Sequence, residues 1–584
     1  MAVSLPQKDN NKQKRAKELL EARQGVDYDF SVVENVPLAT TIPEDAQPDL
    51  AWQMKIVAGS YKTRRNWEKL HDKFDLVYEE PMPYKSVSEL AKMLSNKDLL
   101  EIMAYCDPDQ GKFLSENRPK SFDEYFKFFL HFDAPEGCRE YQCDKAFADY
   151  FTAGLNPVMI EALTKIPSKL ILDESCFASH SAFADDNLQA AMNDGRVFYV
   201  DYKAMLDLEP GEYEGRQKHV YAPIVVLALP KGKDNLEVVG IQLGQSGDQQ
   251  IMVTPAMGKW DWLVAKTMVK VTDANYHELV SHLAYTHLIA EPIAIASFRQ
   301  FSRNHPLYEL LIPHFVGTLP INRLATRVLI NKGGTVETLL TFKIESAYKL
   351  IENVRTQYKF REQFPKNDCE RRGTGTKSKL KNYPYRDDAI LIWDAIQTWV
   401  EAYVDTFYQS DRDVQEDHEL AAWVDEIQSP KAGSINDFTL TGSLDSRKEL
   451  VEILTMTIFT ASAQHAAMNF PQGRSAAVPY QPLSAFAPVP TQLGLSEEDA
   501  LEFLPPVNLA IDQTHTMNFL GNTHHTQLGG YPLGTFSDKS IVPALWKFQY
   551  RLNRIESEID SRNEGRRLPY PFLKPSMIPQ SINI

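Results

Sequence analysis

Cysteine is scarce in this chain and follows no disulfide pattern. Five cysteines occur among 584 residues, and none of them forms a Cys-x-x-Cys pair. An odd number without regular spacing excludes the disulfide scaffold that is typical of small secreted domains. We therefore expect free thiols and a cytoplasmic, reducing location. The five positions are Cys106, Cys138, Cys143, Cys176 and Cys369.

Long apolar runs and an amino-terminal leader are also missing. No run approaches the roughly 20 apolar residues that span a bilayer. The first residues, MAVSLPQKDNNKQKRAKELL, lack the apolar centre of a signal peptide. We expect a soluble protein whose contact with a membrane, if it makes any, is peripheral.

Basic residues are outnumbered by acidic ones, 62 against 78, which gives a formal net charge of −16. This balance provides no general attraction to nucleic acid or to anionic bilayers. A P-loop is absent too, because the glycine-containing stretch at 373–381 lacks the spacing of that motif. We expect a small apolar partner and no nucleic acid.

One histidine-rich stretch stands out against these absences. Residues 276–292 read YHELVSHLAYTHLIAEP, so His277, His282 and His287 recur at every fifth position among apolar residues. A buried imidazole needs a polar partner, and three of them at a fixed interval indicate a metal site. The alternative is that ordinary contacts satisfy all three rings.

The five-residue interval conflicts with a regular α-helix, in which such residues lie about 140° apart around the axis. A π-turn brings residues five apart onto one face, and π-turns tend to mark functional sites. We therefore predict a π-bulge between His282 and His287. The interval also argues against a zinc protease, whose His-Glu-x-x-His motif needs four residues.

A second helical stretch, TASAQHAAMNF at 460–470, places His465 and Asn469 four residues apart and so on one face. Ser446 and Glu449 form a capping-box pattern that predicts the start of this helix. The alternative for the pair is a buried polar contact between helices. Spacing alone does not select which of the histidines would bind a metal.

Several stretches in fixed order resemble the signature blocks of the lipoxygenase family. The resemblance begins near Lys145 and continues to the end, over about three quarters of the chain. Residues 1–110 show little strand alternation, so the chain resembles a short, bacterial-type form without the amino-terminal β-barrel of many relatives. The blocks are HELVSHLAYTHLIAEP, SFRQFSRNHPLYELLIPHF, INRLATRVLINKGG, SAQHAAMNFPQ and IPQSINI.

The resemblance implies one non-haem iron, and a mixed nitrogen and oxygen ligand set suits such a metal. His277 matches a family histidine that does not bind iron. The implied ligands are His282, His287, His465, Asn469 and the carboxylate of Ile584. Glu278 and Gln472 are expected to contact the ligands and to tune them without binding the metal. The alternative for Glu278 is a solvated helix carboxylate.

The implied activity is that of a fatty-acid dioxygenase. Ferric hydroxide removes a hydrogen atom from the doubly allylic carbon of a cis,cis-1,4-pentadiene, and O2 adds to the pentadienyl radical to give a hydroperoxide. The expected partners are a polyunsaturated fatty acid and O2. No catalytic side chain is expected beyond the iron-bound hydroxide, since the protein mainly positions the diene and excludes water.

Five apolar residues match family positions associated with the substrate pocket. Ala325 stands where alanine tends to accompany S products, and Leu329, one turn later, should face the same space. Val336, Leu339 and Leu340 match positions associated with pocket depth. Plain core packing is the alternative for these last three residues.

The predicted fold is mainly α, with one large helical catalytic domain at 76–584 after a helical extension at 1–75. β-branched and aromatic residues predict a small antiparallel sheet from 196–202, 220–229 and 236–243.

Three local expectations accompany this fold. The charged stretch at 10–23 forms a short helix or a frayed arm. Pro292 should kink or end the histidine helix, because proline has no amide donor. His305 and His314, which lie beside prolines, are interpreted as structural.

Two other functions stay open at the level of sequence. One is a helical metalloenzyme of another reaction class, and the other is a lipid-binding protein without catalysis. The intact ligand set weakens the second alternative.

Overall fold

The histidine-rich stretch lies in the middle of one continuous helix of 42 residues, Lys259–Gln300. It consists of α8 (Lys259–Tyr276), a π-helical segment (His277–His287) and α9 (Leu288–Gln300). By length and composition, this is the one helix in the described part of the chain that could cross a membrane. However, 89% of its apolar window is buried inside the molecule. It is the central helix around which the others pack.

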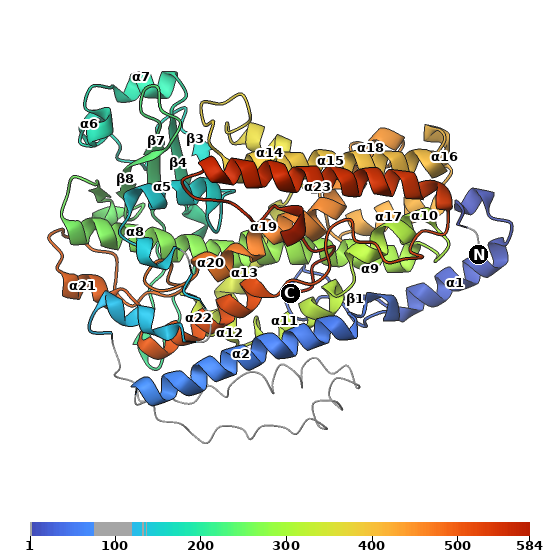
Figure 1. The fold of residues 1–584 in the computed structure, drawn as a ribbon, viewed down its shortest axis with the longest axis horizontal. Helices are drawn as coiled ribbons and strands as arrows, with labels where there is room; N and C mark the ends of the chain where they lie inside the picture. The colour runs from blue at the N-terminus through green and yellow to red at the C-terminus, as the bar shows by residue number, and fades with distance from the viewer. Residues whose placement is uncertain (1–2, 75–118, 131–132, 136) are drawn as a thin grey trace.

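The computed structural model describes residues 3–74, 119–130, 133–135 and 137–584 (Figure 1), and over these residues the prediction of a mainly α fold is confirmed. Cys106 and all of 75–118 lie outside the described residues, and the other four cysteines are free thiols, as predicted. The remaining helices are α1 (Lys12–Gly25), α2 (Leu50–Phe74), α5 (Asp144–Ala153), α6 (Glu174–Ala178), α7 (Leu188–Asn193), α10 (Pro306–Leu311), α11 (Thr318–Val328), α12 (Thr335–Leu339), α13 (Ile344–Gln357), α14 (Pro365–Arg371), α15 (Pro384–Phe407), α16 (Asp411–Gln415), α17 (His418–Gln428), α18 (Arg447–Phe459), α19 (His465–Asn469), α20 (Pro471–Ser475), α21 (Glu497–Glu502), α22 (Val507–Asn522) and α23 (Val542–Gly565).

Pro292 lies inside α9, so of the two expected outcomes the end of the helix is wrong, and the kink stays a prediction. A proline removes one amide donor from the helix ladder and leaves the rest of the ladder in place. Because α9 packs against α1, α11 and α17, tertiary contacts keep it helical beyond the proline.

The second histidine helix is also interrupted by a π-helical segment. α18 runs from Arg447 to Phe459, the segment Thr460–Gln464 is π-helical, and α19 begins at His465. Ser446 caps α18 by accepting the Glu449 amide at 3.3 Å. The Glu449 carboxylate accepts from the Leu440 amide instead of the cap residue, so only half of the predicted capping box forms.

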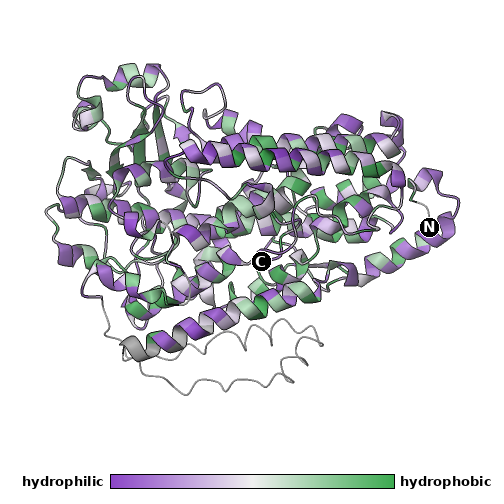
Figure 2. Cartoon of the chain, viewed as in Figure 1, coloured by the Kyte–Doolittle hydropathy of each residue, from purple (hydrophilic) through white to green (hydrophobic). Residues whose placement is uncertain are grey.

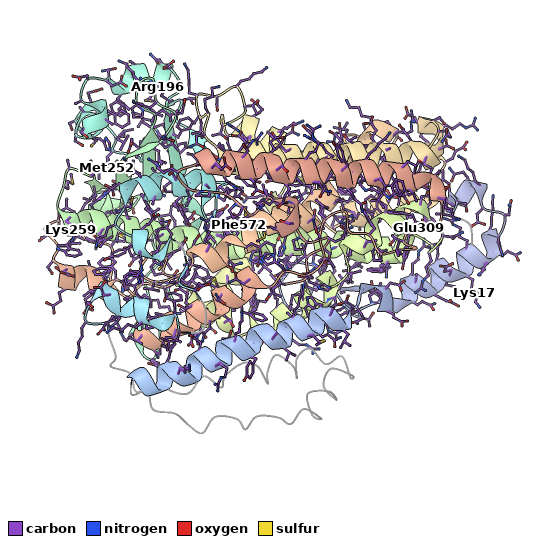
Figure 3. All side chains as sticks on the ribbon, in the orientation of Figure 1. Lys17, Arg196, Met252, Lys259, Glu309 and Phe572 are labelled. Atoms are coloured by element: carbon purple, nitrogen blue, oxygen red, sulfur yellow. The ribbon has the colours of Figure 1, made fainter. Side chains whose placement is uncertain are left out.

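Long helices cover this core along both edges of the molecule. α15 and α23 lie side by side along one edge, and α2 runs along the opposite edge (Figure 1). Apolar and polar residues alternate along these outer helices (Figure 2), as expected for helices with one buried stripe. Side chains fill the spaces between the layers (Figure 3), where Phe572 is buried.

The predicted antiparallel sheet is confirmed at one end of the molecule, with strand order β3-β4-β7-β8-β9. Both of its faces are covered, because Val225 and Leu227 join the main core whereas Val226 joins a smaller core beneath α6 and α7. This double burial explains why the middle strand is continuously apolar. The strands are β3 (Glu161–Ala162), β4 (Val197–Asp201), β7 (Ile224–Ala228), β8 (Glu237–Gln242) and β9 (Met252–Val253), and two short hairpins pair β1 (Tyr28–Asp29) with β2 (Leu38–Ala39) and β5 (Glu212–Tyr213) with β6 (Arg216–Gln217).

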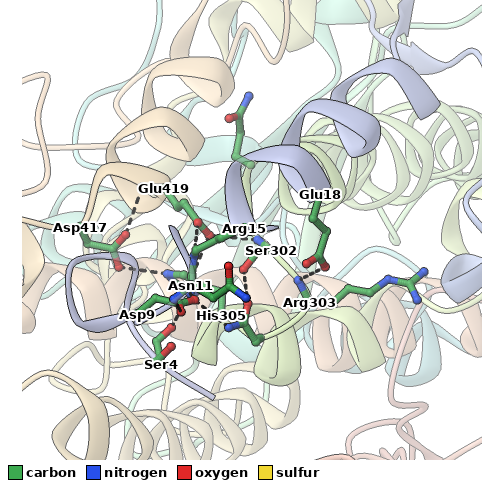
Figure 4. A network of polar contacts seen from close by, with 12 residues as sticks. Ser4, Asp9, Asn11, Arg15, Glu18, Ser302, Arg303, His305, Asp417 and Glu419 are labelled. Atoms are coloured by element: carbon green, nitrogen blue, oxygen red, sulfur yellow. Dashed lines mark hydrogen bonds and ion pairs between the residues drawn. The ribbon is translucent and has the colours of Figure 1, made fainter. Parts of the chain in front are cut away.

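The charged stretch near the amino terminus is a docked helix and not a frayed arm. Arg15 of α1 is 4% exposed, and its guanidinium forms a bidentate ion pair with the carboxylate of Glu419 of α17 (Figure 4). The Glu419 carboxylate also accepts the Ser302 amide at 2.9 Å. Since Leu5 and Trp52 belong to the main hydrophobic core, residues 3–74 pack as part of the same body. The division into an extension and a catalytic domain stays a prediction.

Candidate metal centre

Three imidazole nitrogens from the two histidine helices converge on one point. The Nε2 atoms of His282 and His287 are 3.3 Å apart, and that of His465 lies 3.4 Å from the first and 3.1 Å from the second. The predicted π-turn is confirmed, and it brings residues five apart onto one face of the central helix. Among the described residues, these three form the group of His, Cys, Asp or Glu side chains that could hold a metal ion.

The outer nitrogen of two of these rings is directed away from the cluster. His287 Nδ1 donates to Asn322 Oδ1 at 2.7 Å, and His282 Nδ1 lies 3.6 Å from a carboxylate oxygen of Glu278. A proton on Nδ1 leaves the Nε2 lone pair of a neutral imidazole free to bind a cation. Glu278 lies beside the His282 ring, and its role in tuning that ligand stays a prediction.

Burial favours the uncharged form of these rings by lowering their pKa values. Desolvation lowers the pKa of His282, lowers that of His287 to about 3 with a further effect of the neighbouring His282, and lowers that of His465 well below its usual range. Neutral imidazole is the form that binds metals.

The cluster fits a metal ion better than it fits an empty core. With Nδ1 protonated, the Nε2 lone pairs of His282 and His287 face each other at 3.3 Å and repel unless a proton or a cation lies between them. The same spacing suits adjacent nitrogen ligands of a single first-row ion, which bind at about 2 Å.

His277 is the histidine that stays outside the cluster. Its Nε2 donates to the Met468 carbonyl at 2.8 Å, and its Nδ1 lies 3.2 Å from Glu278. The ring thus joins the central helix to α19 and has a structural partner on each side.

The candidate amide ligand lies on α19, one turn after His465. Asn469 is fully buried, and its Oδ1 accepts from Gln472 Nε2 at 2.9 Å. Its Nδ2 donates to the Leu520 carbonyl of α22 at 2.9 Å. These two bonds fix the plane of the amide, so Gln472 contacts the residue that the sequence suggested.

The last residue of the sequence also lies at this cluster. Ile584 is 3% exposed, and its backbone oxygen is within hydrogen-bond reach of His465. The preceding residues run through the interior, where the Gln580 carbonyl accepts from His314 Nδ1 at 2.7 Å. His314 therefore has the structural role that the sequence predicted, as does His305, which pairs with Asp417.

The five candidate pocket residues form one continuous turn region. The Leu329 amide donates to the Ala325 carbonyl, the Val336 amide to the Leu329 carbonyl and the Leu340 amide to the Val336 carbonyl, each at 2.9 Å. Leu339 and Leu340 are buried in the main core, whereas Leu329 and Val336 are half-buried. Their role in binding a substrate stays a prediction.

Sequence reasoning overlooked Asn322 and Glu291. Asn322 accepts from His287 and donates to Glu291 Oε2 at 2.7 Å, while Glu291 Oε1 accepts the Ala39 amide at 2.8 Å. Burial raises the pKa of Glu291 to about 8. The available signal was a polar residue inside the apolar INRLA block and an acid inside the central helix.

Comparison with known proteins also finds lipoxygenases, and the match extends along nearly the whole chain. A family model described as Lipoxygenase matches residues 23–570. A linoleate 9/13-lipoxygenase of Pseudomonas aeruginosa is 38% identical over 474 residues, which is 77% of this chain and 68% of that protein. The polyunsaturated fatty acid lipoxygenase ALOX15B of Homo sapiens is 35% identical over 456 residues, with 77% and 67% covered.

Solved structures with a similar fold are also lipoxygenases. The solved structure of a calcium-dependent 11R-lipoxygenase is similar to this chain with a TM-score of 0.85 at 25% identity. The superposition covers 100% of this chain and 83% of that one.

Proposed function

Because the chain belongs to the lipoxygenase family and is a dioxygenase of that family, we propose that it converts polyunsaturated fatty acids with a cis,cis-1,4-pentadiene into hydroperoxides, using iron. The observation that carries this proposal is the convergence of three neutral Nε2 atoms on one buried point. The relatives' names support the substrate class, since one acts on linoleate and another on polyunsaturated fatty acids.

We assign the metal to a mixed set of nitrogen and oxygen donors. Bound iron would supply the one-electron oxidant that removes a hydrogen atom from the diene. The two kinds of donor together suit a first-row ion such as iron. The proposed ligands are His282, His287, His465, Asn469 and the carboxylate of Ile584.

The residues of the chain itself have three tasks in this proposal. The rings of His282 and His287 are oriented by Glu278 and Asn322, and the amide of Asn469 by Gln472. The helices around the cluster keep water away from a radical on the diene. Ala325, Leu329, Val336, Leu339 and Leu340 are proposed to shape the space in which the fatty acid lies.

A cytoplasmic location belongs to the same proposal and is supported by the four free thiols among the described residues. Peripheral contact with a membrane stays a prediction, which sedimentation with lipid vesicles would test.

The test combines a metal analysis with an assay of conjugated-diene absorbance. The purified protein, incubated with linoleate in air, should produce a conjugated diene and consume O2, and it should contain about one iron per chain. Iron without diene formation would favour a metalloenzyme of another reaction class. Binding of linoleate without metal and without turnover would favour a lipid-binding protein.

A further inference from the structure

The carboxyl-terminal segment is held by hydrogen bonds at nearly every residue. The Leu528 amide donates to the Ile578 carbonyl at 2.8 Å, and the Gln580 amide donates to Thr526 Oγ1 at 3.1 Å. Thr318 Oγ1 donates to the Ile582 carbonyl at 3.0 Å. These bonds hold the backbone of the segment that precedes Ile584 in place.

The contact closest to Ile584 comes from the other end of the chain. Trp52 of α2 is fully buried, and its indole Nε1 donates to the Asn583 carbonyl at 2.6 Å. This carbonyl belongs to the peptide that joins Asn583 to Ile584. Because the peptide is planar, this bond also fixes the Cα atom of Ile584, from which the terminal carboxylate projects.

Gly317 packs closely against Asn583. Its amide donates to the Ala46 carbonyl, just before α2, at 2.8 Å. Its φ is +87°, and an added Cβ would lie 3.0 Å from Asn583 Cβ, so a glycine is needed there for both reasons. The amino-terminal segment, α11 and the carboxyl-terminal tail thus meet at one point.

α2 reaches the second oxygen donor through α22. Gly59 of α2 faces the Phe519 ring, and Asn66 lies 2.9 Å from His515 Nε2. The residue after Phe519 is Leu520, whose carbonyl accepts from the amide of Asn469. A shift of α2 would therefore move the contacts of both oxygen donors, Asn469 and Ile584. The three imidazoles lie on other helices.

We infer that α2 is a positioning element for the oxygen side of the metal centre, with Trp52 as the positioning residue for Ile584. The inference rests on the proposed function, since it assumes a metal held by the five assigned ligands. It gives the amino-terminal segment a task in metal retention that its sequence did not suggest.

A matched pair of tryptophans tests this inference. Trp52→Phe removes the indole donor to Asn583, and Trp423→Phe removes an equally buried donor, which bonds Ser297 Oγ at 3.0 Å between α17 and α9. Both variants lose one buried hydrogen bond, so their unfolding midpoints should fall by similar amounts.

The decisive readout is the rate at which the iron-loaded protein releases its metal to a chelator. Trp52→Phe should accelerate release about 10-fold, the effect typical of losing a partner that orients a ligand. Trp423→Phe should release iron at the wild-type rate. Equal rates in the two variants would overturn the inference and leave α2 a packing element.

A second variant serves if Trp52→Phe does not fold. Gly59→Ala favours the helix but places a methyl group 3.1 Å from the Phe519 ring, which pushes on α22. Faster metal release from this variant supports the inference, and the wild-type rate contradicts it. A wild-type protein that holds no iron would instead refute the proposed function.

Discussion

The nitrogen donors and the oxygen donors of the metal centre are held in different ways. His282, His287 and His465 lie on two buried helices, and local π-turns set their directions. Ile584 lies at the end of an extended tail, which receives hydrogen bonds from α2 and from the start of α11. Helix periodicity thus places the nitrogen donors and the amide of Asn469 on α19, whereas contacts between distant parts of the chain place the carboxylate of Ile584.

Removing a nitrogen donor should have the largest effect. His287→Ala and His465→Ala each delete a strong ligand, so we expect iron content and diene formation to fall to background. His277→Ala is the control, because its ring lies outside the cluster and loses contacts to the Met468 carbonyl and to Glu278 but no metal ligand. Metal analysis checks this prediction. Loss of iron in His277→Ala with retention in His287→Ala would reverse the assignment.

Extending the chain beyond Ile584 should remove one oxygen donor and keep all three imidazoles. An added residue converts the terminal carboxylate into an amide, so diene formation should be lost while the helical circular dichroism is unchanged. A tag on the amino terminus is the control and should be harmless. Normal turnover and iron content in the extended protein would exclude Ile584 as a ligand.

Asn322→Leu should weaken the nitrogen side without removing a ligand. The His287 ring loses its acceptor, and we expect metal affinity to fall 10- to 100-fold, that is by about 1.4–2.7 kcal/mol. Asn508→Leu is a matched control, because this buried amide bonds Tyr213 instead. Competition with a chelator measures the affinity, and equal values for the two variants would refute an orienting role.

The pH dependence of stability should reveal the carboxyl behind Asn322. Burial raises the pKa of Glu291 to about 8. The folded state therefore holds a proton that the unfolded state releases near pH 4.5, so this stabilisation is present below pH 4.5 and is lost as the pH rises towards 8. In the metal-free protein, the free energy of unfolding should fall by up to a few kcal/mol between pH 5 and 8 because of this group, and Glu291→Gln should remove that fall. An unchanged slope would show that Glu291 is ionised in the folded state.

Ala325→Gly should have the smallest effect on the metal centre and should change only the product. We expect the unaltered protein to form mainly S hydroperoxide, and the glycine to admit O2 at another face or carbon. Chiral chromatography of the products checks both statements. An R product from the unaltered protein would contradict the role of Ala325.

The nitrogen side could be predicted from the sequence because its signals are local. If two histidines five residues apart share one ion, the interval predicts a π-turn, and segments rich in β-branched and aromatic residues predict a sheet, wherever the rest of the chain lies. Pro292 was misjudged for the opposite reason, since packing against α1, α11 and α17 overrides the local preference of proline.

The supports of the oxygen side could not be predicted in this way. Trp52 and Asn583 are separated by 531 positions, and nothing in either segment indicates the other. One support of the nitrogen side was missed for the same reason, since Asn322 and His287 are 35 positions apart and belong to different helices. Such partners become visible only when the fold brings the helices together.

Reconstitution with metal tests the central claim most directly. The protein is stripped of metal, and linoleate oxidation is measured after separate addition of ferrous iron, manganese or zinc. The account predicts no activity in the stripped protein, recovery with iron, and none with zinc, which binds nitrogen donors but has no redox chemistry. Equal activity in the stripped protein, or recovery with zinc, would contradict a redox metal at the three-histidine cluster.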